Sequence, residues 1–257
     1  MRLGGWSIAG AIVAITLVAG GWWLHARPAR AAEAPCRVQS FEGSDFTVCV
    51  YRQGQDRLSL LLNGPDGPLG DLASVAAFLG PKARDVRFAM NGGMYAPGQT
   101  PVGLLVQDGQ TRHPAELSTG SGNFFLLPNG VFYVDRDGGA HVEETHAFMA
   151  HAERALWATQ SGPLLLNNGA MHPAVMPNGD SVLIRNGVCV AGPDTAWFVI
   201  SDGKVSFGRL ARFFRDGLGC RDALYLDGTV SSLWAPSLHR RDTRKGLGPF
   251  VVVSRAP

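Results

Sequence analysis

The residues of this chain that could do chemistry are polar side chains that follow apolar segments and stand beside glycine. They form five groups: Asn91-Gly92-Gly93, Glu116 with Ser121-Gly122-Asn123, Gln160-Ser161-Gly162-Pro163, Arg185-Asn186-Gly187, and Asp227-Gly228 with Ser231-Ser232. Arginine offers a forked set of donors for phosphate oxygens, and bare glycine amides can add further donors. Asp and Glu can act as acid, base or nucleophile at a sugar carbon. Together these groups suit an anionic ligand that is rich in hydroxyls.

Each group also has an ordinary structural interpretation. Asn-Gly is a strong hairpin signal, so Asn91-Gly92 could form a turn and nothing more. Asp227 could bond a backbone N–H two residues further along, as in an Asx turn. Arg185 could be one partner of a surface ion pair. The residue types alone leave both interpretations open.

Several familiar sites are absent from the sequence. It has no G-x-S-x-G elbow, no P-loop, no H-E-x-x-H pair and no glycine fingerprint that opens a helix after a strand. The stretch from Asp135 to Gly138 opens like a calcium loop, but His146 stands where the twelfth, acidic ligand belongs, so a hairpin turn is favoured. We expect no metal and no cofactor.

Composition and the first residues suggest an exported protein that does not bind nucleic acid. The formal net charge of the 257 residues is +2, and no long run of Lys and Arg occurs. Arg2, the apolar run from Trp6 to Leu24 and the small residues of Ala29-Arg30-Ala31 predict a signal peptide over 1–31. The apolar run is long enough for an uncleaved membrane anchor as well. The predicted location is periplasmic or secreted, with any membrane contact only through this segment.

The four cysteines all lie beyond this segment. An even number in an exported chain suggests two disulfides, for which three connectivities are possible, and free buried thiols are the alternative. Chain order favours Cys36 with Cys49 and Cys189 with Cys220, because each of these pairs closes a shorter loop.

The elements that must position the polar groups are mostly strands. Apolar and alternating segments predict strands at 46–51, 58–62, 86–90, 102–107, 123–127, 131–134, 164–166, 197–200, 223–226 and 251–253. Asp71 and Ser206 are candidate caps of helices, and a third helix is expected over 147–159. Strands outnumber helices and are joined by hairpin-length turns. We therefore expect an α+β fold, a single domain with an antiparallel-rich mixed sheet and a few helices.

The order of the polar groups resembles the phosphodiester glycosidase family. The stretches that carry the resemblance are Asn91-Gly92-Gly93-Met94-Tyr95, Pro101-Val102-Gly103-Leu104 with Gly122-Asn123-Phe124, Gln160 to Pro163, Arg185, and Leu226-Asp227-Gly228 with Ser231-Ser232. The resemblance covers a domain over 36–257. One departure is that many members have Asp-Gly-Gly-Gly-Ser where this chain has Asp227-Gly228-Thr229-Val230-Ser231.

The resemblance implies an exported hydrolase that cleaves a sugar-1-phosphodiester, with a sugar-phosphate or glycan as its substrate. Asp227 would be the acid, base or nucleophile, Glu116 the second carboxylate, and Arg185 would stabilise the phosphate leaving group. The residues expected to bind substrate are Asn91, Gly92, Gly93, Asn123, Gln160, Ser161, Gly162, Gly228 and Ser231. The alternatives are a non-catalytic envelope module that binds sugar-phosphate polymers, and a periplasmic hydrolase of another linkage.

Overall fold

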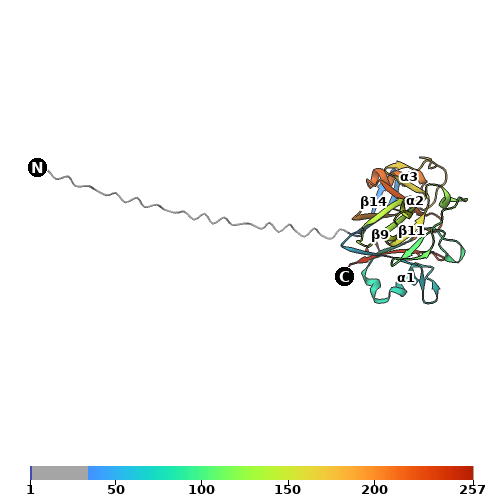
Figure 1. The fold of residues 1–257 in the computed structure, drawn as a ribbon, viewed down its shortest axis with the longest axis horizontal. Helices are drawn as coiled ribbons and strands as arrows, with labels where there is room; N and C mark the ends of the chain where they lie inside the picture. Colours follow the sequence, from blue (N-terminus) through green and yellow to red (C-terminus); the bar gives the residue numbers. More distant parts are fainter. Residues whose placement is uncertain (2–33, 257) are drawn as a thin grey trace. The chain divides into compact units, whose positions relative to one another are not determined.

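The computed structural model of the chain describes residue 1 and residues 34–256, and the second of these ranges is one compact unit (Figure 1). The signal peptide or anchor predicted over 1–31 lies outside the described residues. Among the helices formed by residues 34–256, none is long and apolar enough to cross a membrane.

Three antiparallel sheets make up most of this unit. The largest has seven strands in the order β1 (Cys36–Phe41), β2 (Ser44–Arg52), β15 (Thr195–Ser201), β14 (Asn186–Gly192), β16 (Asp222–Asp227), β12 (Leu164–Asn167) and β13 (Ala170–Met171). A five-stranded sheet has the order β10 (Ala140–Glu144), β9 (Gly130–Asp135), β11 (Ala155–Ser161), β7 (Leu105–Gln107) and β8 (Gln110–His113). A second five-stranded sheet has the order β18 (Arg240–Arg241), β17 (Leu233–Ala235), β6 (Val86–Asn91), β19 (Phe250–Arg255) and β3 (Asp56–Leu61), and β4 (Asn63–Gly64) pairs with β5 (Gly67–Pro68).

The three sheets share one apolar core, and each has a helix on its outer face. Residues from all three sheets, such as Phe198, Phe132 and Phe88, are fully buried together. The outer faces are covered by α3 (Phe207–Arg212) on the seven-stranded sheet, α2 (Thr145–Met149) on the sheet of β9, and α1 (Leu72–Leu79) on the sheet of β6. Because most strands are buried on both faces, they are apolar at nearly every position.

The predicted α+β class is confirmed, and so are the two helix caps. Asp71 accepts the N–H of Ser74 at 2.6 Å at the start of α1, and Gly80 ends that helix. Ser206 accepts the N–H of Arg209 at 3.2 Å at the start of α3. A capping side chain acts within its own turn, which is why these two starts are visible in the sequence.

Two predicted elements are wrong. The helix expected over 147–159 is only α2 and a short 3₁₀ turn, and the chain then becomes β11. β11 lies between β9 and β7 and hydrogen-bonds to both, so sheet pairing overrides the helical pattern. The strand expected over 123–127 is a 3₁₀ turn over Asn123–Phe125, followed by the cis peptide before Pro128.

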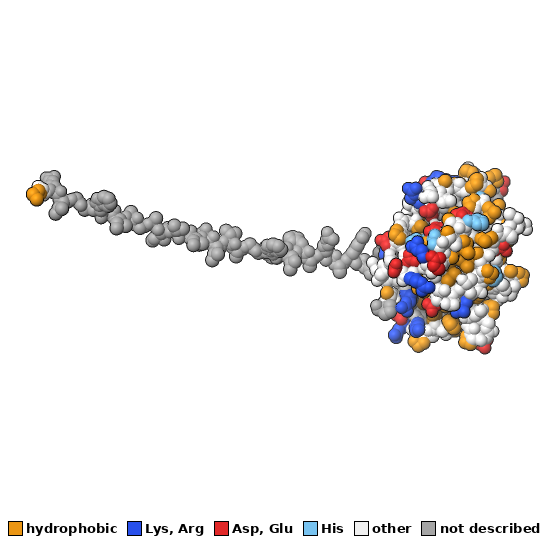
Figure 2. Space-filling model, in the orientation of Figure 1, with side chains coloured by type: hydrophobic (Ala, Val, Ile, Leu, Met, Phe, Trp, Pro, Cys, Tyr) orange, Lys and Arg blue, Asp and Glu red, His pale blue; other side chains and the backbone are white. Residues whose placement is uncertain are grey.

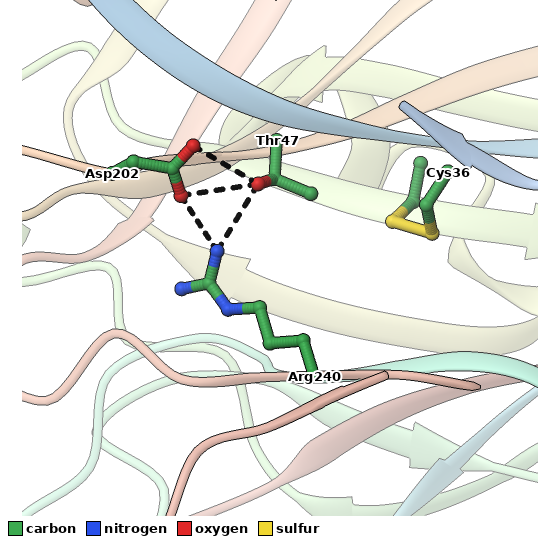
Figure 3. The surroundings of a disulfide bond; sticks show 5 residues. Cys36, Thr47, Asp202 and Arg240 are labelled. Atoms are coloured by element: carbon green, nitrogen blue, oxygen red, sulfur yellow. Dashed lines mark hydrogen bonds and ion pairs between the residues drawn. A yellow bond between two sulfur atoms is a disulfide. The ribbon is translucent and has the colours of Figure 1, made fainter. Parts of the chain in front are cut away.

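Both disulfides favoured by chain order are present. Cys36 is bonded to Cys49 between β1 and β2, close to the cluster of Thr47, Asp202 and Arg240 that Figure 3 shows. Cys189 of β14 is bonded to Cys220, which precedes β16. Disulfides persist in oxidising compartments, so this pair of bonds fits an extracellular or periplasmic protein.

We expect the loss of either disulfide to lower the free energy of unfolding by about 2–4 kcal/mol, because each bond restricts the unfolded chain. The bonds span 13 and 31 residues, so the loss should be larger for Cys189→Ala with Cys220→Ala than for Cys36→Ala with Cys49→Ala. Urea unfolding of both double variants measures this. Equal stability of a double variant and the wild type would contradict the prediction.

Candidate active site

Four strand ends from the three sheets meet at one place. β6 ends at Asn91, β11 ends at Ser161, β16 ends at Asp227, and β14 begins at Asn186, which lies opposite Asp227 in the ladder. The sheets are joined here by side chains. The amide of Asn186 donates to the carbonyl oxygen of Asn91 at 2.9 Å, and the hydroxyl of Ser161 donates to the carbonyl oxygen of Leu226 at 3.0 Å. Polar residues that are far apart in the sequence are therefore neighbours.

Asn91, Asn186, Ser231 and Ser232 form a hydrogen-bonded network beside Asp227. The Asn91 side-chain oxygen accepts the N–H of Ser232 at 2.8 Å and the amide of Asn186 at 3.2 Å. The Ser231 hydroxyl lies 3.2 Å from the Asn186 side-chain oxygen and 3.1 Å from the Asp227 carbonyl oxygen. The Asn91 amide nitrogen is buried and has no partner among the described residues. A buried donor without a partner is costly, and a ligand oxygen would satisfy it.

Asp227 forms the turn that its sequence position suggested, and one of its carboxyl oxygens stays outside that turn. Its Oδ1 accepts the backbone N–H groups of Gly228, Thr229 and Val230 at 2.5, 2.8 and 3.3 Å, which is an Asx-type turn. Oδ2 accepts no hydrogen bond within residues 34–256. Asp227 is 8% exposed, and burial raises the pKa of its carboxyl group although the three N–H groups act in the opposite direction. One oxygen is thus fixed by the turn while the other is free to act.

Arg185 lies beneath this turn and is completely buried. It donates from Nε to the Val205 carbonyl oxygen at 2.9 Å, from one terminal nitrogen to the Tyr225 hydroxyl at 3.0 Å, and from the other to the Ser181 carbonyl oxygen at 2.9 Å. No carboxylate of the described chain pairs with it, and burial lowers its pKa. The surface ion pair considered for Arg185 is therefore wrong. A direct phosphate contact would require these bonds to be exchanged, whereas the observed contacts position Tyr225 and the Asp227 turn.

Three of the candidate glycines are required by close packing: Gly93, Gly162 and Gly228. A Cβ at Gly228 would overlap the Tyr225 hydroxyl and lie 3.2 Å from an Arg185 nitrogen. A Cβ at Gly93 would overlap the Gln160 carbonyl and lie 2.6 Å from the Thr159 hydroxyl. The hairpin alternative for Asn91-Gly92 is wrong, because β6 pairs with β17 and β19 and not with the segment that follows it. The loop at Gly92 and Gly93 instead carries the chain from β6 across to β11.

Gln160 holds a second group of candidate residues. Its side-chain oxygen accepts the N–H groups of Leu104 and Glu116 at 3.0 and 2.9 Å, and its amide donates to the Glu116 carbonyl oxygen at 2.7 Å. The Glu116 carboxylate accepts the N–H of Ser118 at 2.7 Å. The side chain of Ser118 and then this N–H lower the pKa of the Glu116 carboxyl group. Asn123 begins the neighbouring 3₁₀ turn. Gly162 packs against this turn, because a Cβ at Gly162 would lie 2.5 Å from the Phe124 carbonyl oxygen.

Within residues 34–256 no hydrogen bond links Glu116 to the Asp227 network. Glu116 bonds to Gln160 and Ser118, whereas the carboxylate of Asp227 bonds to the backbone of residues 228–230. The side-chain amide of Gln160 hydrogen-bonds to the backbone of Leu104 and Glu116, and it therefore holds the loop of Glu116 in place. Ser161 is joined to the strand of Asp227 by its hydroxyl, which donates to the Leu226 carbonyl oxygen. Contact of a substrate with Gln160, Ser161 or Gly162 stays a prediction.

Three residues of the candidate site have no role of their own among the sequence-based predictions. Asn186 lies next to Arg185, Tyr225 comes two residues before Asp227, and Tyr95 follows the Asn91-Gly92-Gly93 loop. Burial raises the pKa of Tyr95 to about 12, and the nearby charge of Asp227 contributes to this shift. The only sequence signal for these three residues is that each lies close to a motif residue. Their contacts depend on how distant segments come together, which the sequence pattern does not show.

The site has an open hollow of about 660 Å³ at its edge, whose wall includes Ser231 and Ser232. A hollow of similar size, about 670 Å³, is lined by Val190 and Asp222, at the opposite ends of β14 and β16. Because Asn186 and Asp227 stand at the near ends of the same strands, this second hollow is not part of the site. Within residues 34–256 no cluster of His, Cys, Asp or Glu could hold a metal ion.

Comparison with known proteins identifies the family. The sequence profile of the phosphodiester glycosidase family matches residues 84–248, and the chain belongs to that family. These residues include all four strand ends that form the site. The chain is 39% identical over 149 residues to the uncharacterized protein YigE of Escherichia coli K12, and this match spans 58% of each chain.

Solved structures of distant relatives share the fold. The catalytic domain of zebrafish N-acetylglucosamine-1-phosphodiester alpha-N-acetylglucosaminidase, auto-inhibited by its pro-peptide, superposes with a TM-score of 0.59 at 14% identity, over 86% of this chain and 82% of that one. A protein of Burkholderia pseudomallei described as exported has a TM-score of 0.54 at 14% identity, over 83% of this chain and 74% of that one.

Proposed function

We propose that this protein is an exported hydrolase that cleaves sugar-1-phosphodiesters at the anomeric carbon. The observation that carries the proposal is the state of Asp227: a buried carboxylate with one oxygen fixed by three N–H groups and the other without a partner. It stands at the end of a buried strand in a member of the phosphodiester glycosidase family. A rigid carboxylate that faces a polar network is what catalysis at a sugar carbon needs.

In the proposed reaction, the bond between the anomeric carbon and the phosphate oxygen breaks and water supplies the new hydroxyl group. The transition state resembles an oxocarbenium ion, so the Asp227 carboxylate acts in its ionised form, either as the nucleophile or as the base that activates water. The phosphate leaves as an anion and needs its charge stabilised more than it needs a proton. Asn91 and Ser231 are placed to bind oxygens of the substrate.

The other predicted residues have supporting roles in this proposal. Arg185 positions the Asp227 turn through Tyr225, and Gly228 provides the room for that contact. The place where the loop after β6 meets β11 would form one wall of the substrate site, with Gly92, Gly93, Gln160, Ser161 and Gly162. Glu116 is bonded to Gln160, and Asn123 precedes Phe124, against which Gly162 packs. Glu116 remains the candidate for a second carboxylate that a loop movement would bring to the substrate.

The lack of a hydrogen bond between Glu116 and the Asp227 network among the described residues favours one competing function. Glycosidases generally use a pair of carboxylates, and a family member with only one at the site could bind sugar-phosphate polymers without cleaving them. The Thr229-Val230 departure from the glycine-rich pattern is a second reason to consider this binding module.

Turnover of defined substrates separates the two functions. The protein is incubated with a panel of sugar-1-phosphodiesters in ¹⁸O-labelled water, and the release of reducing sugar is measured. We expect free sugar that carries the label on its anomeric hydroxyl, because the carbon–oxygen bond breaks. Label in the phosphate would identify a phosphodiesterase instead. Saturable binding without sugar release would establish the binding module.

Export forms part of the proposal and rests on the two disulfides and on the predicted signal peptide. Signal peptidase would cut near residue 31. N-terminal sequencing of the protein recovered from the cell envelope tests this, and a chain that still begins at Met1 would favour the anchor.

A further inference from the structure

The hollow at the edge of the candidate site has a basic wall, and these basic residues have no role in the proposed reaction. Besides Ser231 and Ser232 of the site network, its lining includes Arg240, Arg241, Asp242 and Arg244. These four charged residues belong to β18 and the segment that follows it. On the face drawn in Figure 2, acidic and basic side chains are interspersed.

Two of these four charges cancel each other. Arg240 binds Asp242 from Nε at 3.1 Å, and a terminal nitrogen reaches Asp202 at 2.6 Å. Figure 3 shows the Arg240 guanidinium directed toward Asp202 and Thr47. Asp242 is satisfied further by the N–H of Leu233 at 2.9 Å. Arg240 is therefore a fixed part of the structure, and its charge is compensated.

Arg241 and Arg244 keep their charges. Neither forms an ion pair with a carboxylate of the described chain, and both are exposed. Arg244 donates to the Thr229 carbonyl oxygen at 2.9 Å, within the turn that Asp227 holds. This contact places the Arg244 guanidinium against the Asp227 turn, and its positive charge acts against the burial that raises the pKa of Asp227. The hollow thus carries two guanidinium groups without a carboxylate partner among the described residues, and one of them, that of Arg244, is bonded to the turn that Asp227 holds.

We propose that this hollow is an anion subsite, in which Arg241 and Arg244 bind the phosphate and a second anionic group on the leaving-group side of the substrate. The inference rests on the proposed function, and it names the substrate class as sugar-1-phosphodiesters whose aglycone carries a further negative charge. Arg185 does not fill this role in the observed geometry, because its donors are bonded to protein groups. The leaving phosphate still requires a cation. Arg244 can supply it, because its guanidinium is bonded to the Asp227 turn.

The size and shape of the hollow support a ligand longer than one phosphate. Its volume of about 660 Å³ extends from Ser231 to Arg241, and it is open to solvent. Guanidinium groups bind phosphate or carboxylate oxygens through paired donors. Arg244 is anchored to the turn by one contact and keeps further donors for a ligand.

Binding of inorganic pyrophosphate tests the subsite without any turnover. The full chain is titrated calorimetrically at two salt concentrations, together with Arg241→Gln, Arg244→Gln and the double variant. Arg57→Gln is the control, because Arg57 is exposed on β3, at the edge of the same sheet opposite to β18. We expect each single substitution to weaken binding about tenfold, as the loss of roughly 1.4 kcal/mol does. The double variant should not bind measurably, and Arg57→Gln should bind like the wild type.

Kinetics on a cleavable diester separates this inference from the proposed function. With a substrate whose leaving group carries a second phosphate, KM should rise at least tenfold in the double variant, and a substrate with a neutral aglycone should show a smaller rise. Pyrophosphate binding that depends on both arginines, without turnover of any diester, would support the subsite and overturn the hydrolase. Normal turnover and normal pyrophosphate binding in the double variant would overturn the subsite and keep the hydrolase. Equal loss of binding in Arg57→Gln would also overturn it, because the effect would then be one of net charge.

Discussion

Asp227→Asn is expected to lower the rate of sugar-1-phosphodiester cleavage on the order of 10²-fold or more, while the protein stays folded. The oxygen of an Asn side chain can accept the same three backbone N–H groups that Oδ1 of Asp227 accepts, so the turn survives. The amide that replaces Oδ2 can neither attack carbon nor take a proton from water. The variant therefore removes the chemistry and keeps the local structure.

The same variant makes a prediction about stability and pH. The folded-state pKa of Asp227 is raised by burial, so the folded protein binds this proton more readily than the unfolded chain does. The stabilisation from the protonated carboxyl is complete below the unfolded-state pKa and is lost as the pH rises through the folded-state pKa. At neutral pH Asp227→Asn should thus melt no lower than the wild type. As the pH falls through the folded-state pKa, the wild type should gain stability relative to the variant.

Asp222→Asn is the matched control for both measurements. Asp222 begins the strand that Asp227 ends, and its Oδ1 also accepts a backbone N–H, that of Asn168 at 2.7 Å. It lines the hollow at the far end of the strand, so its replacement should leave turnover unchanged. Near wild-type turnover of Asp227→Asn would refute the assignment of Asp227 and move the catalytic role to Glu116. Steady-state rates and thermal melts between pH 4 and 8 supply both readouts.

The parts of this structure that the sequence predicts correctly depend on local patterns. The caps at Asp71 and Ser206 and the end of α1 at Gly80 are determined within one turn of chain. The disulfide pairing follows from loop length. By contrast, Ala155–Ser161 becomes a strand only because β9 and β7 flank it, and those partners come from distant parts of the chain.

In the candidate site, too, features set by the local sequence could be predicted and contacts between distant segments could not. The position of Asp227 at a strand end could be predicted, because it is the first polar residue after the apolar run 223–226. The contact between Asn91 and Asn186 could not, because it joins strands of two different sheets. The departure at Thr229-Val230 also has a structural explanation: both residues take part in the Asp227 turn through their backbone N–H groups, and neither has a positive φ. Glycine is therefore not required at these two positions for the turn to form.

Burial changes what is expected of Arg185. From the sequence, Arg185→Lys should lose activity with little change in stability, since a surface guanidinium would contact only the substrate. In the structure the guanidinium satisfies the Val205 carbonyl, the Ser181 carbonyl and the Tyr225 hydroxyl, and it stacks 3.7 Å over the Phe207 ring. A lysine ammonium cannot reach all of these groups from one position. Both activity and stability should therefore fall.

The stability loss in Arg185→Lys should be on the order of 3–5 kcal/mol, because each buried polar group without a partner costs about 1–3 kcal/mol and the buried charge loses its contacts. For a domain of this size, that loss lowers the melting temperature on the order of 10 °C. Arg209→Lys on α3 is the control. Arg209 is partly exposed and bonds the Ser44 hydroxyl at 2.9 Å, so its replacement should change the melting temperature by only a few degrees.

Activity measured well below the melting temperature then separates a positioning role from general destabilisation. If Arg185 positions Tyr225 and the Asp227 turn, kcat of the folded Arg185→Lys protein should fall while KM changes little, because the carboxylate is misplaced and the arginines of the hollow are untouched. A rise in KM with unchanged kcat would instead indicate that Arg185 contacts the substrate. A wild-type melting temperature would show that the guanidinium is not held by the buried groups, and the direct phosphate contact expected from the sequence would then be the better explanation.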